Sequence, residues 1–355
     1  MKASFMTVMY LLTVSLFASV TTPCIANDRH DTASHAVVFM YHHFGESDVP
    51  TTNVTIDQFK HHIEWLGMEG FNVWPLDRIV EHLRHDRPIP DKTIAITIDD
   101  TYVSVFSHAF PLLKSRNWPF TVFVSTDVVD QRLPAYMTWE QMREMQQHGV
   151  TFANHSATHR HLIRMRQDET LPQWKRRVTA DIRYAQARLE DELGDAPSLF
   201  AYPYGEYNTM LAAIVADLGL TGFGQQSGAI GPYSDLRILP RYPMAEAFAQ
   251  IGEFKTKALS LALPVTKVTP WDPQLQEDER QPLMTVTLAS SEARLDQLVC
   301  YVSGQGAAEV SWLGEKRFSV RAQRPLPVGR SRYNCTAPAE ESGRYYWFSH
   351  LWIRS

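Results

Sequence analysis

Cysteine is scarce in this chain, with 3 residues among 355, and glycine and proline number only 17 and 21. These contents exclude a disulfide-dense scaffold and a collagen-like or low-complexity chain. The length exceeds the ~250–300 residues at which one core usually stops growing, so we expect one large domain and a smaller one. If the protein is secreted, the odd number of cysteines needs an explanation.

The chain also lacks any long run of lysine or arginine, and its formal net charge is −5. Polyanions are bound through dense positive charge, so we expect no nucleic-acid partner and no polybasic membrane contact.

Long apolar runs are missing too, apart from one near the start. Lys2 precedes an apolar stretch at 10–20, and Cys24 and Ala26 occupy the small-residue positions typical of a signal-peptide cleavage site. Residues 1–26 are therefore predicted to be a signal peptide of a periplasmic or secreted protein. A membrane anchor is the alternative, but the run is shorter than the ~20 residues of a span. We expect no membrane span after cleavage.

Residues 35–262 alternate short apolar strands with amphipathic helical stretches. The predicted strands are 36–40, 93–98, 120–124, 150–153, 198–201, 220–223 and 238–239, and the predicted helices are 56–68, 103–115, 139–147, 171–193 and 209–217. Such alternation is typical of parallel strands joined by crossover helices, in a barrel or in an open doubly wound sheet.

Beyond residue 262 the pattern changes. Prolines and a charged cluster indicate a linker at 263–282, and short alternating segments without helical periodicity predict a small β-sandwich at 283–355. Aromatic residues such as Tyr346 and Trp352 could form a sugar-binding face there, but packing in a small core explains them as well.

All but one of the 14 histidines lie in the first half of the chain. Five on charged helical stretches are interpreted as solvated: His61, His62, His82, His85 and His148.

Two predicted strand ends carry residues that suit a metal ion. Asp99 and Asp100 end a buried strand, where adjacent carboxylates are costly unless a cation neutralises them. His155 and His159 follow another strand, and two histidines four positions apart share one face of a helical turn. One aspartate and two histidines suit a divalent ion such as zinc. Taken singly, the aspartates could cap a helix and the histidine spacing could be fortuitous.

A third strand end carries Tyr202-Pro203-Tyr204-Gly205. Because the carboxyl ends of parallel strands meet at one edge of a sheet, we expect the three strand ends to form one site. Tyr202, Pro203 and Tyr204 are predicted to bind substrate. The tyrosine rings and Trp139 could stack on sugars, with core packing as the alternative.

These motifs, in this order, resemble those of the polysaccharide deacetylases, a carbohydrate esterase family that removes N-acetyl groups from chitin, peptidoglycan and related polymers. The resemblance covers roughly residues 37–257 and implies an α/β fold, a distorted (β/α)7 barrel, to which the small C-terminal β-sandwich is added. The segments 39–45 and 239–241 look most like the subgroup acting on poly-β-1,6-N-acetylglucosamine in biofilm formation. The implied partner is a polysaccharide containing N-acetylglucosamine.

Carried over to this sequence, the resemblance implies that Asp100, His155 and His159 hold a divalent ion, zinc in preference to nickel, cobalt or iron. Asp99 would be the general base, and the backbone N–H of Tyr204 would stabilise the oxyanion. Peptidoglycan and chitooligosaccharides are alternative substrates, and a non-catalytic, metal-containing sugar-binding protein is a second alternative.

Two positions depart from the family pattern. Ala201 stands where the family usually has an arginine that pairs with the base, and Arg241 is the candidate substitute, with a surface arginine as the alternative. The late histidine that commonly supplies the catalytic acid is missing, because only His350 follows residue 161. His42, at the end of the first strand, is a candidate for this acid.

The signal peptide also accounts for the odd cysteine. Cys24 would leave with it, and Cys300 and Cys335 would remain, both in the β-sandwich and in an oxidising compartment. We predict that they form a disulfide.

Overall fold

The structure is a computed structural model that describes Met1, residues 34–341 and residues 343–355. Apart from Met1, the predicted signal peptide lies outside these residues, as does Cys24. No helix within the described ranges is long and apolar enough to cross a membrane.

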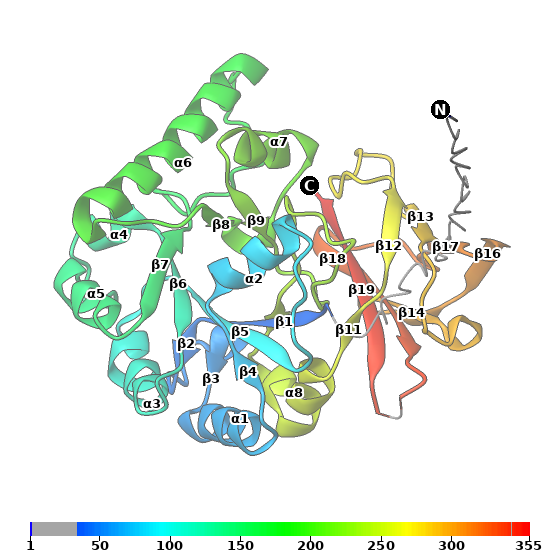
Figure 1. Ribbon diagram of the computed structural model, residues 1–355. Coiled ribbons are helices and arrows are strands. Elements are labelled where there is room, and N and C mark those ends of the chain that lie inside the picture. The colour runs from blue at the N-terminus through cyan, green and yellow to red at the C-terminus, as the bar shows by residue number, and fades with distance from the viewer. Residues whose placement is uncertain (2–33, 342) are drawn as a thin grey trace. The chain divides into compact units, whose positions relative to one another are not determined.

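A sheet of parallel strands forms the centre of the larger domain (Figure 1). The strands follow the order β10-β1-β5-β6-β7-β8-β9, and β4 pairs with β5 beside this path. Their bounds are β1 (Ala36–Tyr41), β4 (Asn72–Val73), β5 (Thr93–Asp99), β6 (Phe120–Val124), β7 (Val150–Asn154), β8 (Leu199–Ala201), β9 (Thr221–Phe223) and β10 (Tyr242–Pro243). Every residue of β1, β5 and β6 is buried, which is why these strands are continuous apolar or β-branched runs in the sequence.

Residues 239–243 join the two edges of this sheet. Leu239 forms a parallel bridge with Phe223 of β9, and β10, which follows directly, pairs with β1. The sheet therefore curves into a distorted (β/α) barrel, as the family resemblance implied. The strand predicted at 238–239 is reduced to this one bridge, and the last strand of the barrel is β10.

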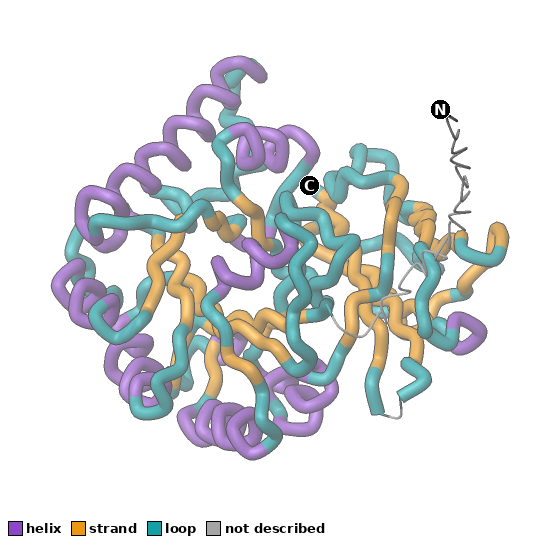
Figure 2. Tube along the Cα trace, in the orientation of Figure 1, coloured by secondary structure: helices purple, strands orange, loops and turns teal. Residues whose placement is uncertain are grey.

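Most of the helices lie around the outside of the barrel sheet (Figure 2). Their bounds are α1 (Ile56–Met68), α2 (Leu76–Arg84), α3 (Phe110–Lys114), α4 (Thr126–Asp130), α5 (Trp139–Gln146), α6 (Leu171–Leu193), α7 (Thr209–Asp217) and α8 (Ile251–Ala258). The ends of α1, α6 and α7 are those predicted, and a capping box between Thr55 and Gln58 begins α1. The helix predicted at 103–115 begins instead with a π-helical turn, Val105–Ala109, before α3.

The interpretation of His62 as solvated is wrong. This side chain is fully buried on the inner face of α1, with Nδ1 3.0 Å from the Tyr41 hydroxyl and Nε2 2.7 Å from the carbonyl oxygen of Ala249. Its ring also stacks on Phe254. Burial lowers the pKa of His62 to about 4.

The strands after residue 260 form a C-terminal module of two sheets with a common apolar core. One sheet has the order β11-β19-β18-β14-β15 and the other β12-β13-β17-β16. Their bounds are β11 (Leu261–Ala262), β12 (Val265–Thr269), β13 (Leu283–Leu288), β14 (Val299–Val302), β15 (Gly306–Ala308), β16 (Val310–Gly314), β17 (Arg317–Arg321), β18 (Gly329–Pro338) and β19 (Tyr345–Arg354). A short two-stranded sheet, β2 (His43–Phe44) with β3 (Asn53–Val54), lies apart from both.

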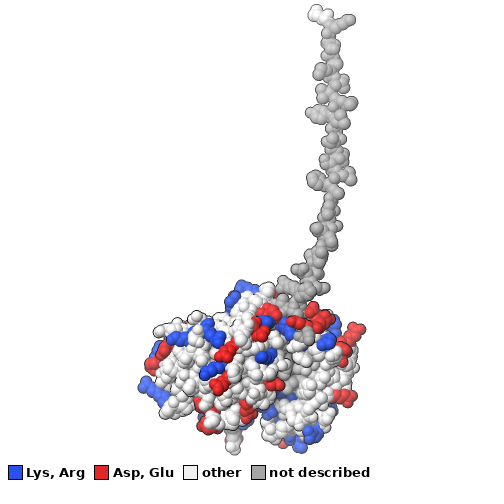
Figure 3. All heavy atoms as spheres, turned by 90° about the horizontal axis from the view of Figure 1, so that it is seen from below, with Lys and Arg blue, Asp and Glu red and all other residues white. Residues whose placement is uncertain are grey.

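The segment 263–282, interpreted as a linker, contributes β12 to this module, where it pairs with β13. The predicted disulfide is present between Cys300 of β14 and Cys335 of β18, which lie directly opposite each other. On the face of the molecule in Figure 3, Lys and Arg side chains are interspersed with Asp and Glu, so this face carries charge of both signs.

Candidate active site

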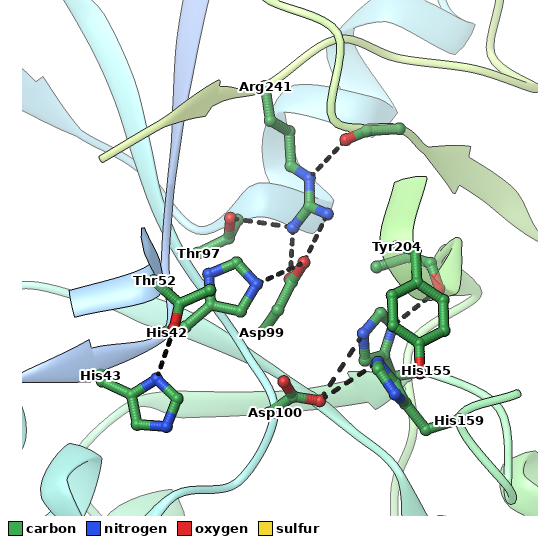
Figure 4. A network of polar contacts seen from close by, with 12 residues as sticks. His42, His43, Thr52, Thr97, Asp99, Asp100, His155, His159, Tyr204 and Arg241 are labelled. Carbon is green, nitrogen blue, oxygen red and sulfur yellow. Dashed lines mark hydrogen bonds and ion pairs between the residues drawn. The ribbon is translucent and has the colours of Figure 1, made fainter. Parts of the chain in front are cut away.

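Four elements of the barrel bring the predicted site residues together at the carboxyl ends of its strands (Figure 4). The end of β5 carries Asp99 and Asp100, the segment after β7 carries His155 and His159, and the turn after β8 carries Tyr204. Arg241 arrives from the residue just before β10. The ends of β5, β7 and β8 thus lie together, as expected for the carboxyl ends of parallel strands.

Asp100, His155 and His159 form a compact set of side chains that could hold a metal ion. Oδ1 of Asp100 lies 3.9 Å from Nε2 of His155 and 3.4 Å from Nε2 of His159, and one ligand atom from each residue falls within 4.8 Å of the others. Two imidazole nitrogens and a carboxylate oxygen on one side leave the other positions around an ion open for water or substrate. The three residues therefore fit a divalent transition metal.

His155 is held in the state that a metal requires. Its Nδ1 lies 2.8 Å from the carbonyl oxygen of Ala201, so Nδ1 carries the proton and Nε2 is left as the free acceptor on the side of Asp100. Burial lowers the pKa of His155 to about 4, and the neutral ring that results is the form that binds metal.

Asp99 forms a fully buried pair with Arg241. Nη1 of Arg241 lies 2.5 Å from Oδ1 of Asp99 and Nη2 lies 2.8 Å from Oδ2, which makes a two-pronged contact. The guanidinium also donates to the Gly224 carbonyl and the Thr97 hydroxyl. Burial alone would raise the pKa of Asp99, but the charge and hydrogen bonds of Arg241 outweigh it and hold this pKa well below its usual range.

The alternative that Arg241 is a surface residue is therefore wrong, because its side chain has no exposed area. Arg241 pairs with Asp99 from a strand end other than the one that carries Ala201. His42 also lies near this pair, with Nε2 4.0 Å from Oδ2 of Asp99, and its side chain is 16% exposed.

Several residues of the site have backbone conformations that side chains seldom adopt. Of the ten described non-glycine residues with positive φ, four lie here: Asp100, Ser156, His159 and Tyr204. Such conformations cost on the order of 1–3 kcal/mol each and are often found at functional sites. At Asp100, the φ of 62° comes directly after the extended Asp99, so the adjacent carboxylates face different partners.

Tyr204 lies in a tight turn that begins where β8 ends. Its φ is 60°, and the next residue, Gly205, has a φ of 68°. A Cβ on Gly205 would lie 2.9 Å from the backbone nitrogen of Gln225, so only glycine fits there. The turn is closed by hydrogen bonds from the Gly205 N–H to the Tyr202 carbonyl and from the Glu206 N–H to the Pro203 carbonyl.

The structure corrects part of the predicted substrate-binding set. The Tyr202 ring is fully buried against Phe200 and Tyr207, and its hydroxyl donates to the Arg237 carbonyl, so it cannot stack on a sugar. Pro203 is buried as well. For Tyr202 the alternative of core packing is correct, because side chains alternate in direction as the chain leaves β8. Trp139 is also largely buried and donates to Asp130.

Tyr204 remains close to the metal ligands. Its ring centroid lies 4.7 Å from that of His159 and 4.0 Å from that of His161, on which it stacks. His161 itself pairs with Glu206 through Nδ1 at 2.7 Å.

An aromatic stack beside Asp100 was not anticipated from the sequence. The ring of Tyr102 lies between those of His43 and Tyr136, at centroid distances of 3.6 Å and 5.1 Å. The position of Tyr102 two residues after Asp100 was an available signal. His43 and Tyr136 could not be placed, because they come from other parts of the chain.

Comparison with known proteins shows which family part of the chain resembles. Residues 86–223 match the family model described as polysaccharide deacetylase, a span that contains the metal-ligand set, Asp99 and Tyr204 but ends before Arg241. The chain is 26% identical to Bacillus subtilis YxkH, over 48% of this chain and 57% of that protein. It is 23% identical to a poly-β-1,6-N-acetyl-D-glucosamine N-deacetylase of Escherichia coli, over 56% of this chain and 35% of that protein. The matches therefore span only part of these relatives.

Two solved structures have the same fold over most of their own length. IcaB from Ammonifex degensii is 24% identical with a TM-score of 0.56, covering 64% of this chain and 99% of that chain. The Streptococcus pyogenes deacetylase PplD is 22% identical with a TM-score of 0.56, covering 61% and 95%. From the sequence match, with the fold in agreement, we conclude that this chain contains a polysaccharide deacetylase domain and is related to the poly-β-1,6-N-acetyl-D-glucosamine N-deacetylases.

Proposed function

We propose that this protein is an exported, metal-dependent N-deacetylase that hydrolyses the acetamide of N-acetylglucosamine residues in a β-1,6-linked exopolysaccharide. The observation that carries the proposal is the Asp100–His155–His159 ligand set directly beside the buried Asp99–Arg241 pair. The choice of substrate rests on the relatives that act on this polymer.

An amide is a poor electrophile with a poor leaving group, so its hydrolysis needs an activated carbonyl, a base for water and an acid for the amine. A divalent ion on the three ligands, zinc before nickel, cobalt or iron, would polarise the acetamide carbonyl and lower the pKa of a coordinated water.

Asp99 would accept the proton of the attacking water. Because Arg241 keeps this carboxylate ionised, it is available as an acceptor at any physiological pH. Arg241 also fixes both carboxylate oxygens in place, so that the base is oriented before substrate binds.

The Tyr204 backbone N–H would stabilise the negative charge that develops on the carbonyl oxygen, since the Tyr204 turn lies against His159. The C–N bond then breaks and the departing amine takes a proton. His42 is the candidate donor, because its ring is partly exposed and lies beside Asp99.

The function can be tested by following the release of amines from oligomers of β-1,6-linked and β-1,4-linked N-acetylglucosamine and from peptidoglycan fragments. We expect turnover on the β-1,6 oligomers that is lost on chelation, regained on adding a divalent ion and abolished in His155→Ala together with the bound metal. His85→Ala, at an exposed histidine that ends α2, is the matched control and should behave as wild type. Turnover on the other polymers alone would contradict the proposed substrate, and activity that survives chelation would contradict the metal.

A further inference from the structure

The side chain of Arg330, in the C-terminal module, contacts the Tyr204 turn. Arg330, on β18, donates from Nη1 to the backbone carbonyl of Tyr204. Its guanidinium lies 6.0 Å from the centre of the Tyr204 ring, and its Nε lies 4.0 Å from Oε1 of Glu206. Arg330 lies more than 100 residues beyond the segment that matches the polysaccharide deacetylase family.

Glu206 links Arg330 to the other side of the same turn. Its side chain is 4% exposed, and while Oε1 faces Arg330, Oε2 is 2.7 Å from Nδ1 of His161. The His161 ring in turn stacks on Tyr204, with the ring planes 15° apart. Tyr204 is therefore restrained at two points, with its ring on His161 and its carbonyl on Arg330. Glu206 contacts both of these partners.

This restraint acts where the backbone is least favourable. A left-handed conformation is unfavourable for a non-glycine residue, so Tyr204 at a φ of 60° needs contacts that favour it over an ordinary conformation. A charged donor on its carbonyl supplies such a contact, because rotation of the peptide would remove the oxygen from Arg330.

We propose that Arg330 is a positioning residue of the deacetylase site, through which the C-terminal module orients the Tyr204 turn for catalysis. The inference rests on the proposed function, in which the Tyr204 N–H faces the oxyanion. Arg330 acts through Tyr204 and takes no part in bond making. A shift of about 1 Å in such a donor can lower turnover about 100-fold.

Contacts that do not involve Arg330 also hold the module against the barrel. The effect of substituting Arg330 can therefore be attributed to the Tyr204 turn. The Asn208 side chain donates to Gln274 at 2.8 Å, and the Trp271 indole donates to Asp235 at 3.1 Å. Leu351 and Ile353 of β19 also belong to the same apolar cluster as residues of the barrel. Loss of one partly exposed arginine should therefore leave the module in place.

The test compares Arg330→Ala, Arg330→Lys and the control Arg317→Ala, an exposed arginine on β17 of the same module. For Arg330→Ala we expect kcat on β-1,6 oligomers to fall about 10-fold to 100-fold, with KM within about twofold and metal content unchanged. Lysine can still donate to the carbonyl and should restore part of kcat. The control should match wild type.

A second readout does not require turnover. Crystal structures of wild type and Arg330→Ala should show Tyr204 leaving its left-handed conformation, or its ring leaving His161, in the variant alone. If wild type is inert but Tyr204 moves, the positioning role stands and the proposed function fails. An unmoved turn with unchanged kcat would overturn the inference, as would a raised KM with unchanged kcat, which would mean that Arg330 binds substrate instead.

Discussion

The barrel and the C-terminal module are both built on β-sheets, but the candidate active site lies in the barrel. Its strands run parallel, so the ends of β5, β7 and β8 meet at one edge and bring Asp100, His155 and Tyr204 together. In the module, β14, β18 and β19 run antiparallel, so successive strand ends lie at opposite edges. Strand direction, more than composition, therefore decides whether side chains at successive strand ends can lie close together.

The two regions also differ in what holds them together. The barrel buries an ion pair, Asp99 with Arg241, and carries four positive-φ residues at the candidate site, features that add little to stability. The module has a smaller apolar core and adds a disulfide between β14 and β18. Changes that remove these features should therefore have different effects on activity and on unfolding.

The largest effect is expected from Asp99→Asn in the barrel. Loss of the proposed general base should lower turnover by roughly 10²–10⁴-fold. The variant also leaves the buried charge of Arg241 without its partner, which should lower the free energy of unfolding by about 3–5 kcal/mol. Amine release and denaturant unfolding measure the two effects. Asp296→Asn, at an exposed aspartate of the module, is the control and should change neither. A drop in turnover of less than tenfold would exclude Asp99 as the base.

A smaller effect is expected from the double variant Cys300→Ser, Cys335→Ser in the module. The bond closes a segment of 35 residues, and its loss should lower the free energy of unfolding of the module by about 3–4 kcal/mol through the entropy of the unfolded chain. Denaturant unfolding should show a module transition at lower denaturant concentration, with the metal content of the barrel unchanged before that transition. Unfolding curves that coincide with wild type would show that the disulfide adds nothing to the module.

The smallest effect concerns pH, through one buried histidine in each region. Burial lowers the pKa of His62 in the barrel to about 4 and that of His350 in the module to about 3, from 6.5 when exposed. Below pH 6.5 the unfolded chain therefore binds protons that the folded chain does not, and stability is lost as pH falls toward these values. Each histidine should cost about 1 kcal/mol between pH 6 and pH 5.

Denaturant midpoints measured across this pH range check the prediction. His350→Leu should flatten the dependence for the module and leave that of the barrel unchanged. An equally steep module transition in this variant would mean that His350 is protonated in the folded state.

Local sequence was sufficient for much of the fold. The buried runs of β5 and β6 and the periodic pattern of α6 depend on neighbouring residues alone, and they were predicted within a residue or so. The helix α2 and the short strand β10 were not predicted, because both patterns are brief. The strand β10 also depends on its pairing with β1, which comes from a distant part of the chain.

For the site, the sequence by itself determined which strand ends carry Asp99 with Asp100, His155 with His159, and Tyr204, because each motif is continuous and ends a recognisable strand. Only the tertiary structure decided that Arg241, 142 residues away, lies against Asp99, since that contact requires the sheet to close through residues 239–243. The same holds for the burial of Tyr202 and for Arg330 at the Tyr204 turn. The spacing of residues within a motif determines the strand end at which they lie. Contacts between residues more than a hundred positions apart depend instead on how the helices and strands pack.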